Sequence, residues 1–191
     1  MDAYKKALID LEKALEEATR LVYPAMALAL NDLGWSNKKI EKTCESMAAV
    51  LSDIPEDKSL IQLLDEETGI ELMCENSDRH WYELTYLNEA SWNEYLRKHN
   101  GRVSRAYMIQ VKMAQKKWCI PMMYATVFMG LIRAFNYKHR WISQLYGNMD
   151  KYLHDVDFDV QKIDQLIRSR LGMYLKYGVD IGFEYVGSDS E

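Results

Sequence analysis

Apolar residues recur at helical spacing along most of the chain. Leu8, Leu11 and Leu15 stand three or four residues apart with Lys and Glu between them, which predicts an amphipathic helix over residues 4–21. Residues 24–33 begin with a proline and are apolar on nearly every side, so a second, buried helix is predicted there. The same reasoning predicts further helices over residues 36–52, 55–69, 91–98, 103–118, 121–132, 137–154 and 160–171.

Proline, serine and glycine mark the ends of these segments. Pro24, Pro55 and Pro121 stand where first helical turns are expected, because proline fits that turn. Ser36 and Ser91 are predicted N-caps. Glycine is the usual left-handed residue after a helix or in a turn, and the breaks of this kind are Gly34, Gly69, Asn100-Gly101 and Gly172.

Two segments have a strand-like pattern. Residues 71–87 contain two short apolar runs around the Asn76-Ser77-Asp78 turn, with a helix as the alternative. Residues 173–186, MYLKYGVDIGFEYV, predict another pair of short strands. The predicted fold class is therefore mainly α with small β-hairpins.

The order of these segments occurs twice. Residues 59–72 align without gaps on residues 162–175, and each half contains an apolar helix that begins at a proline. We therefore predict an internally duplicated helical bundle with pseudo-twofold symmetry, in which the two apolar helices pack together. The predicted boundaries are 1–90 for the first copy with its hairpin, 91–102 for a connecting segment, 103–186 for the second copy and 187–191 for a disordered tail.

The composition is typical of a soluble cytoplasmic protein. Of 191 residues 48% are hydrophobic, enough for a sizeable core. Cys44, Cys74 and Cys119 form no CxxC pair, which argues against a disulfide framework and against a zinc site. The charged N-terminal segment differs from the apolar core of a secretion signal, and the apolar run 118–132 is too short to span a membrane. We expect a cytoplasmic protein without membrane contact.

Two motifs carry a family resemblance. LALNDLGWSNKKIEK (residues 28–42), followed by LIQLLDEETGI (residues 60–70), resembles small helical proteins encoded by Firmicutes phages and prophages. The resemblance covers residues 22–72 and, more weakly, 118–175, where Phe135-Asn136 replaces Gly34-Trp35. It implies no activity. It does imply a mobile-element setting, where small proteins often neutralise host defences.

Charge is distributed unevenly along the chain. Residues 1–95 hold 9 Lys and Arg against 20 Asp and Glu, whereas residues 96–191 hold 15 against 9. No acidic residue occurs between Glu94 and Asp150. Cations at helical spacing with aromatic residues between them have the composition of a nucleic-acid or nucleotide site. The predicted binding residues are Arg102, Arg105, Lys112, Lys116, Lys117, Lys138, His139 and Arg140.

Three interpretations of this basic window remain open. Its cations pair with the acidic first half of the chain, or they bind a nucleic acid or nucleotide, or they bind an acidic protein. The acidic half has its own alternative, as a surface that imitates DNA. Salt dependence separates phosphate binding from the other interpretations, because phosphate binding weakens steeply as salt rises.

No familiar catalytic motif occurs in the sequence. Glycine-rich phosphate loops, GxSxG and HExxH are absent. DVDFD at 155–159 lacks the central glycine and the twelfth-position acid of a calcium loop, and Asp150 with His154 provides a metal with only two ligands. We therefore expect no enzymatic activity, no cofactor and no metal.

These observations favour a non-catalytic binding protein of a phage or mobile element. The predicted role is that of a stoichiometric inhibitor of a host defence system, either anti-CRISPR-like or directed against another system. It is expected to act by contact with a host protein, and a defence component that handles nucleic acid is one candidate. The alternative is a module that sequesters a nucleic acid or signalling nucleotide through residues 97–140. Because a duplicated unit contains its own dimer interface, we expect a monomer or a weak homodimer.

Overall fold

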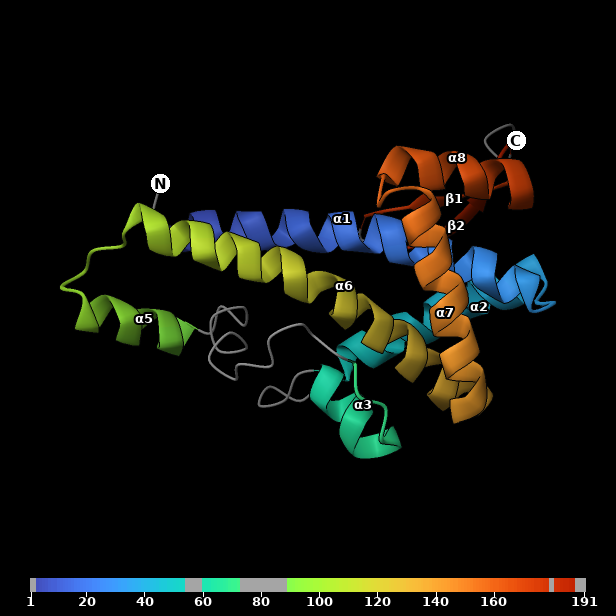
Figure 1. The fold of residues 1–191 in the computed structure, drawn as a ribbon, viewed down its shortest axis with the longest axis horizontal. Coiled ribbons are helices and arrows are strands. Elements are labelled where there is room, and N and C mark those ends of the chain that lie inside the picture. The colour runs from blue at the N-terminus through green and yellow to red at the C-terminus, as the bar shows by residue number, and fades with distance from the viewer. Residues whose placement is uncertain (1–2, 54–59, 73–88, 179–180, 188–191) are drawn as a thin grey trace. The chain divides into compact units, whose positions relative to one another are not determined.

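The computed structural model describes residues 3–53, 60–72, 89–178 and 181–187 (Figure 1). This part of the chain is mainly helical with one two-stranded antiparallel sheet, which confirms the predicted fold class at that level. The strands predicted around residues 76–78 lie outside the described residues. The elements are α1 (Ala3–Asp32), α2 (Asn37–Ser52), α3 (Leu60–Thr68), α5 (Glu89–Lys98), α6 (Arg105–Phe135), α7 (His139–Asp155), α8 (Val160–Leu171), β1 (Met173–Lys176) and β2 (Gly182–Tyr185).

The chain divides into two compact units. Unit 1 comprises Met1–Glu16 and Met73–Pro121, and unit 2 comprises Glu17–Leu72 and Met122–Glu191. Two of the three boundaries between the units, after Glu16 and after Pro121, fall inside helices, so α1 and α6 each begin in unit 1 and end in unit 2. Helix α5 occupies most of the predicted connecting segment, and the predicted repeat boundaries stay a prediction.

Both long helices run through a proline, which corrects the prediction of four separate helices. Helix α1 continues through Pro24, and α6 continues through Pro121. An interior proline removes one backbone hydrogen bond and costs about 3 kcal/mol or more. In α1 burial offsets this cost, because every residue from Ala25 to Leu30 is 0% exposed. Tertiary packing therefore continues the helix where local propensity predicted a boundary.

Other helix ends agree better with the predicted turn residues. Ser36 does precede α2, although its side chain makes no capping hydrogen bond. Ser91 is not an N-cap, because α5 already begins at Glu89. The predicted left-handed breaks are confirmed by positive φ angles at Gly34, Gly69, Asn100, Gly101 and Gly172.

Unit 1 is held together by a small aromatic core between α1, α5 and α6. Ala7, Trp92 and Val111 are buried at its centre. Tyr107 of α6 stacks on Tyr95 of α5, with ring centroids 3.8 Å apart and an interplanar angle of 10°. The N-terminal parts of α1 and α6 therefore pack within one unit although their sequences lie far apart.

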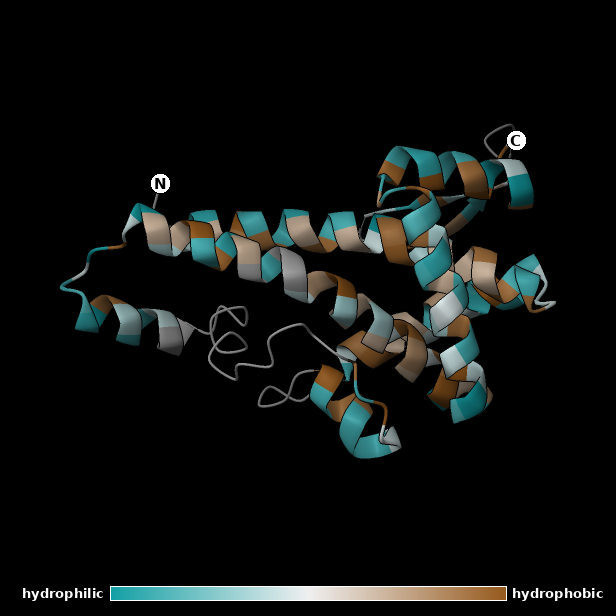
Figure 2. Ribbon diagram, viewed as in Figure 1, coloured by the Kyte–Doolittle hydropathy of each residue, from teal (hydrophilic) through white to brown (hydrophobic). Residues whose placement is uncertain are grey.

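Unit 2 has the larger core. Residues 123–131 of α6 are all buried, which confirms that this apolar segment forms a buried helix. By length and composition α6 would also suffice to cross a membrane, but 61% of its most apolar window is buried inside the protein. Helices α7 and α8 alternate between hydrophilic and hydrophobic residues (Figure 2), and Ile142, Leu145 and Met149 are the buried side of α7.

A glycine sets the closest approach between α6 and α2. A Cβ atom on Gly130 would lie 2.8 Å from Cγ of Met47 and 3.3 Å from its backbone nitrogen. Carbon atoms repel one another below about 3.5 Å, so an alanine at this position would force Met47 to shift. Gly147, an exposed residue within α7, has no such neighbour within 4 Å.

Gly130→Ala is expected to lower the free energy of unfolding by about 1–3 kcal/mol, because overpacking outweighs the helix propensity gained, about 1 kcal/mol. Gly147→Ala gains the same propensity without a clash and should raise the free energy of unfolding by up to about 1 kcal/mol. Adding Met47→Ala to Gly130→Ala relieves the clash, so the two losses should be less than additive in urea unfolding. Strictly additive losses would contradict the contact.

Candidate functional site

The predicted basic residues fall into two groups, one in each unit. The exposed members in unit 1 are Arg102, Arg105 and Lys112. The exposed members in unit 2, at the start of α7, are Lys138, His139 and Arg140. Lys116 and Lys117 lie in α6, and their side chains are outside the described part of the chain. That the two groups form one continuous surface stays a prediction.

In unit 1 the candidate site is built on the exposed side of α6. The hydroxyl oxygen of Ser104 accepts a hydrogen bond from the backbone N–H of Tyr107 at 3.1 Å, which caps the helix just before Arg105. Arg105 and Lys112 are seven residues apart and therefore share one side of the helix. The buried Val111 lies on a different side, in the core of unit 1.

A neighbouring stripe of cations comes from α1. Lys6, Asp10 and Lys13 follow at spacings of four and three residues, so they share one side of α1, and both lysines are exposed. Nζ of Lys112 lies 3.6 Å from Oδ1 of Asp10, so the stripe on α1 and the stripe on α6 are adjacent. We call Lys6, Lys13, Arg105 and Lys112 the basic face.

Sequence reasoning missed the two lysines of α1 because they lie in the acidic half of the chain. The spacing of Lys6, Asp10 and Lys13 already placed them on one helical side. The contact of Asp10 with Lys112 carries the missing information, namely which side of α1 meets α6.

Part of the basic window is paired with the acidic half, as one of the three interpretations expected. Arg133 forms an ion pair with Glu67, in which Nη2 lies 2.6 Å from Oε1, and Lys112 contacts Asp10. The other members of the basic face make no ion pair with a described residue. The basic face therefore keeps an excess of positive charge.

The second group surrounds the first turn of α7. Lys138 is the N-cap residue, its side chain makes no capping hydrogen bond, and the turn contains no acidic residue. The guanidinium of Arg140 lies 5.1 Å from the ring centroid of Trp141, which is 40% exposed. Cations at a helix N-terminus oppose the helix dipole and cost stability. No described carboxylate pairs with these cations.

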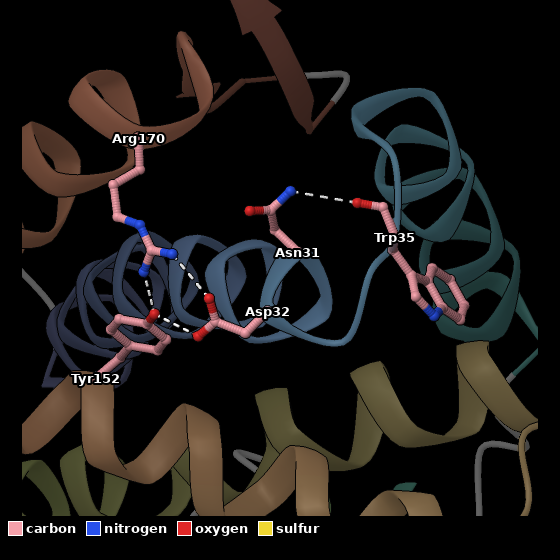
Figure 3. A network of polar contacts seen from close by, with 5 residues as sticks. All are labelled: Asn31, Asp32, Trp35, Tyr152 and Arg170. Carbon is pink, nitrogen blue, oxygen red and sulfur yellow. Dashed lines mark hydrogen bonds and ion pairs between the residues drawn. The ribbon is translucent and has the colours of Figure 1, made fainter.

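A connected polar cluster lies at the C-terminal end of α1 (Figure 3). The hydroxyl of Tyr152 donates to Oδ2 of Asp32 at 2.5 Å, and Nη2 of Arg170 donates to Oδ1 at 2.7 Å. Arg170 also donates to the hydroxyl of Tyr152. Nearby, the side-chain amide of Asn31 donates to the carbonyl oxygen of Trp35 at 3.3 Å. Each carboxylate oxygen of Asp32 accepts a hydrogen bond, so the cluster ties α1, α7 and α8 together.

Two further reactive side chains, Cys44 and His154, have partners or surroundings that bear on their chemistry. Burial, together with Glu41 and Glu45, raises the pKa of the Cys44 thiol to about 12. Such a thiol stays protonated at neutral pH and is a poor nucleophile. Nε2 of His154 lies 3.6 Å from Oδ2 of Asp150. No group of three metal-ligating side chains occurs among the residues that the structure describes.

The described part of the chain thus offers charged surfaces, and the basic face combines cations of two helices. Exposed cations on adjoining helices attract carboxylates or phosphates. No protein-family model, curated protein or solved structure matches the chain. A functional assignment therefore rests on the charge and the side-chain chemistry of these surfaces.

Asp32 makes a pH-dependent contribution to stability. Burial raises its pKa, but hydrogen bonds from Tyr152 and Arg170 outweigh burial, so the pKa of Asp32 lies below its usual value of 3.8. A pKa lowered by folding stabilises the protein above the unfolded-state pKa, and this contribution is lost as the pH falls through the folded-state pKa.

Asp32→Asn should therefore lower the free energy of unfolding at neutral pH by about 1 kcal/mol or less, because the ion pair is partly exposed. The deficit should be smaller at an acidic pH below 3.8, in the range of the lowered folded-state pKa, because the wild-type carboxylate becomes protonated there as well. Urea unfolding of both proteins at the two pH values measures the difference. An equal deficit at both would contradict the assigned role of Asp32.

Proposed function

We propose that the protein is a non-catalytic binding protein that engages an anionic partner through the basic face. The observation that supports this is the juxtaposition of Lys6 and Lys13 with Arg105 and Lys112, with Asp10 as the acidic residue at the seam. Exposed cations that make no ion pair with a described residue contribute little to folding, so the contacts of the described residues give no structural reason for gathering them.

The net charge of the whole chain is opposite in sign to the charge of the basic face. The net charge is −5, so an anionic molecule is repelled by the protein as a whole and attracted by the basic face. Screening limits both effects to about 8 Å at physiological salt. Binding would therefore orient the partner on this face.

The biological setting comes from the sequence motifs. The resemblance of residues 28–42 and 60–70 to proteins of phages and prophages supports a role as a stoichiometric inhibitor of a host defence system. Such a role requires a stable scaffold and a charged surface and no chemistry. The alternative, sequestration of a nucleic acid or nucleotide, uses the same cations and differs in the salt dependence of binding.

The charge requirement is tested by matched reversals. Lys6→Glu/Arg105→Glu should weaken binding of polyglutamate at least about tenfold, because two contacts worth about 1 kcal/mol each become repulsive. Lys38→Glu/Lys42→Glu, on the exposed side of α2 in unit 2, changes the net charge equally and should leave binding nearly unchanged. Asp10→Asn frees Lys112 and should strengthen binding.

Fluorescence anisotropy at low and physiological salt measures these affinities, and circular dichroism checks the fold. Equal losses from the reversals on the basic face and on α2 would reduce the effect to net charge and overturn the proposal. A weaker affinity of Asp10→Asn would do the same, because the proposal requires Asp10 to compete with the partner.

We also propose that the architecture is internally duplicated. A long helix, a second helix and a short helix ended by a left-handed glycine follow one another in α1–α2–α3 and again in α6–α7–α8. Ser36 before α2 has φ −75° and ψ 154°, and Lys138 before α7 has φ −77° and ψ 147°. The positive φ of Gly34 has its counterpart at Asn136, which favours an alignment of Asn136-Tyr137 with Gly34-Trp35.

This correspondence predicts reciprocal substitutions. Asn136→Gly should raise the free energy of unfolding by up to about 1 kcal/mol, because glycine adopts a positive φ without strain. Gly34→Asn should be tolerated with a loss of similar size, whereas Gly34→Val should cost clearly more, because β-branched residues resist that conformation. Thermal unfolding measures all three, and a Gly34→Asn variant as unstable as Gly34→Val would argue against equivalent turns.

A further inference from the structure

Helix α6 exposes apolar side chains beside the cations of the basic face. Ile109 is 51% exposed and Met113 is 57% exposed. With the exposed Ala106 they follow at spacings of three and four residues, so they form an apolar stripe along the helix. Arg105 and Lys112 lie next to this stripe, because Ile109 is four residues after Arg105 and three residues before Lys112.

The core of unit 1 does not use the apolar stripe. That core is built from another side of α6, where Val111 is buried and Tyr107 and Met108 pack against it. Large apolar side chains that stand together beside charged residues are typical of a protein-interaction surface, with an apolar centre and a polar rim.

A nucleic acid complements only the cations of this surface. Phosphates pair with lysine and arginine, but single-stranded bases need aromatic rings on which to stack. Tyr107, on the same part of α6, already stacks on Tyr95. Ile109 and Met113 would therefore face a phosphate backbone with no apolar counterpart.

A lipid surface fits less well for a different reason. Helices that lie in a membrane interface insert a broad apolar face rich in Trp, Phe or Leu. The apolar stripe offers two large side chains, Ile109 and Met113. The net charge of −5 also makes the protein as a whole repel an anionic membrane.

We infer that the partner is an acidic amphipathic helix of another protein, laid along α6 with its carboxylates on the basic face and its apolar residues on the apolar stripe. This inference rests on the proposed function. Arg105 and Lys112 are two helical turns apart, about 10 Å along the axis, so carboxylates seven residues apart on the partner helix meet both. Apolar residues on the adjacent side of that helix then cover Ile109 and Met113, as when a protein recognises an amphipathic helix by its apolar side.

The test uses one double variant that leaves the charge unchanged. Ile109→Ser/Met113→Ser removes the apolar stripe, and Val186→Ser, at a 56% exposed valine of unit 2, is the matched control. The probes are a synthetic helical peptide with Glu and Leu in adjacent stripes at heptad spacing, a scrambled peptide of the same composition, a thymidine oligonucleotide and phosphatidylserine vesicles. Circular dichroism and thermal unfolding of each variant establish that the fold is kept.

The striped peptide is expected to bind the wild-type protein more tightly than the scrambled peptide does. The double variant should bind the striped peptide roughly tenfold or more weakly, whereas Val186→Ser should bind it like the wild type. Two results would overturn the inference and leave the proposed function standing. In the first, anionic probes bind through the charges and the double variant binds them like the wild type. In the second, the apolar stripe is needed for vesicles but not for the peptide. If no anionic probe binds the wild-type protein, the proposed function fails together with the inference.

Discussion

The contact between Gly130 of α6 and Met47 of α2 constrains the packing of unit 2. The two helices meet where a single methyl group would already collide, so the backbone of α6 lies directly against a buried side chain of α2. Interiors packed at crystal-like density neither tolerate an added atom nor collapse freely around a missing one. The contact therefore fixes where α2 crosses α6, and the edge-to-face packing of Trp35 on Phe135, at 5.2 Å between centroids, follows at the helix ends.

Helical periodicity predicted the helices of the described chain because an amphipathic pattern reports which side of a helix is buried. It misplaced the boundaries at Pro24 and Pro121, because whether a proline begins a helix or lies within one depends on the burial of the surrounding residues. Left-handed residues such as Gly172 were predictable, since a positive φ is a local property of the chain. A buried close approach such as that of Gly130 has no local signal.

The candidate site, too, was predicted from the sequence only in part. The shared side of Arg105 and Lys112 follows from spacing alone and was predicted. The contribution of Lys6 and Lys13 was not, because only the packing of α1 on α6 brings the acidic half of the sequence next to the basic window. That packing also answers part of the question left by the sequence, since Lys112 is partly neutralised by Asp10 while Arg105 makes no ion pair with a described residue. Charge counts along a sequence describe its halves, whereas the basic face combines one helix from each half.

Helices α1 and α6 each pass from one unit into the other without a loop. No single cut in the chain therefore separates the units, and dissecting the protein into autonomous fragments means breaking two continuous helices. Helix formation propagates along a segment once it is nucleated. A partner that bound the N-terminal parts of α1 and α6 would therefore stabilise helices that continue into the core of unit 2, and its binding would raise the temperature at which those helices unfold.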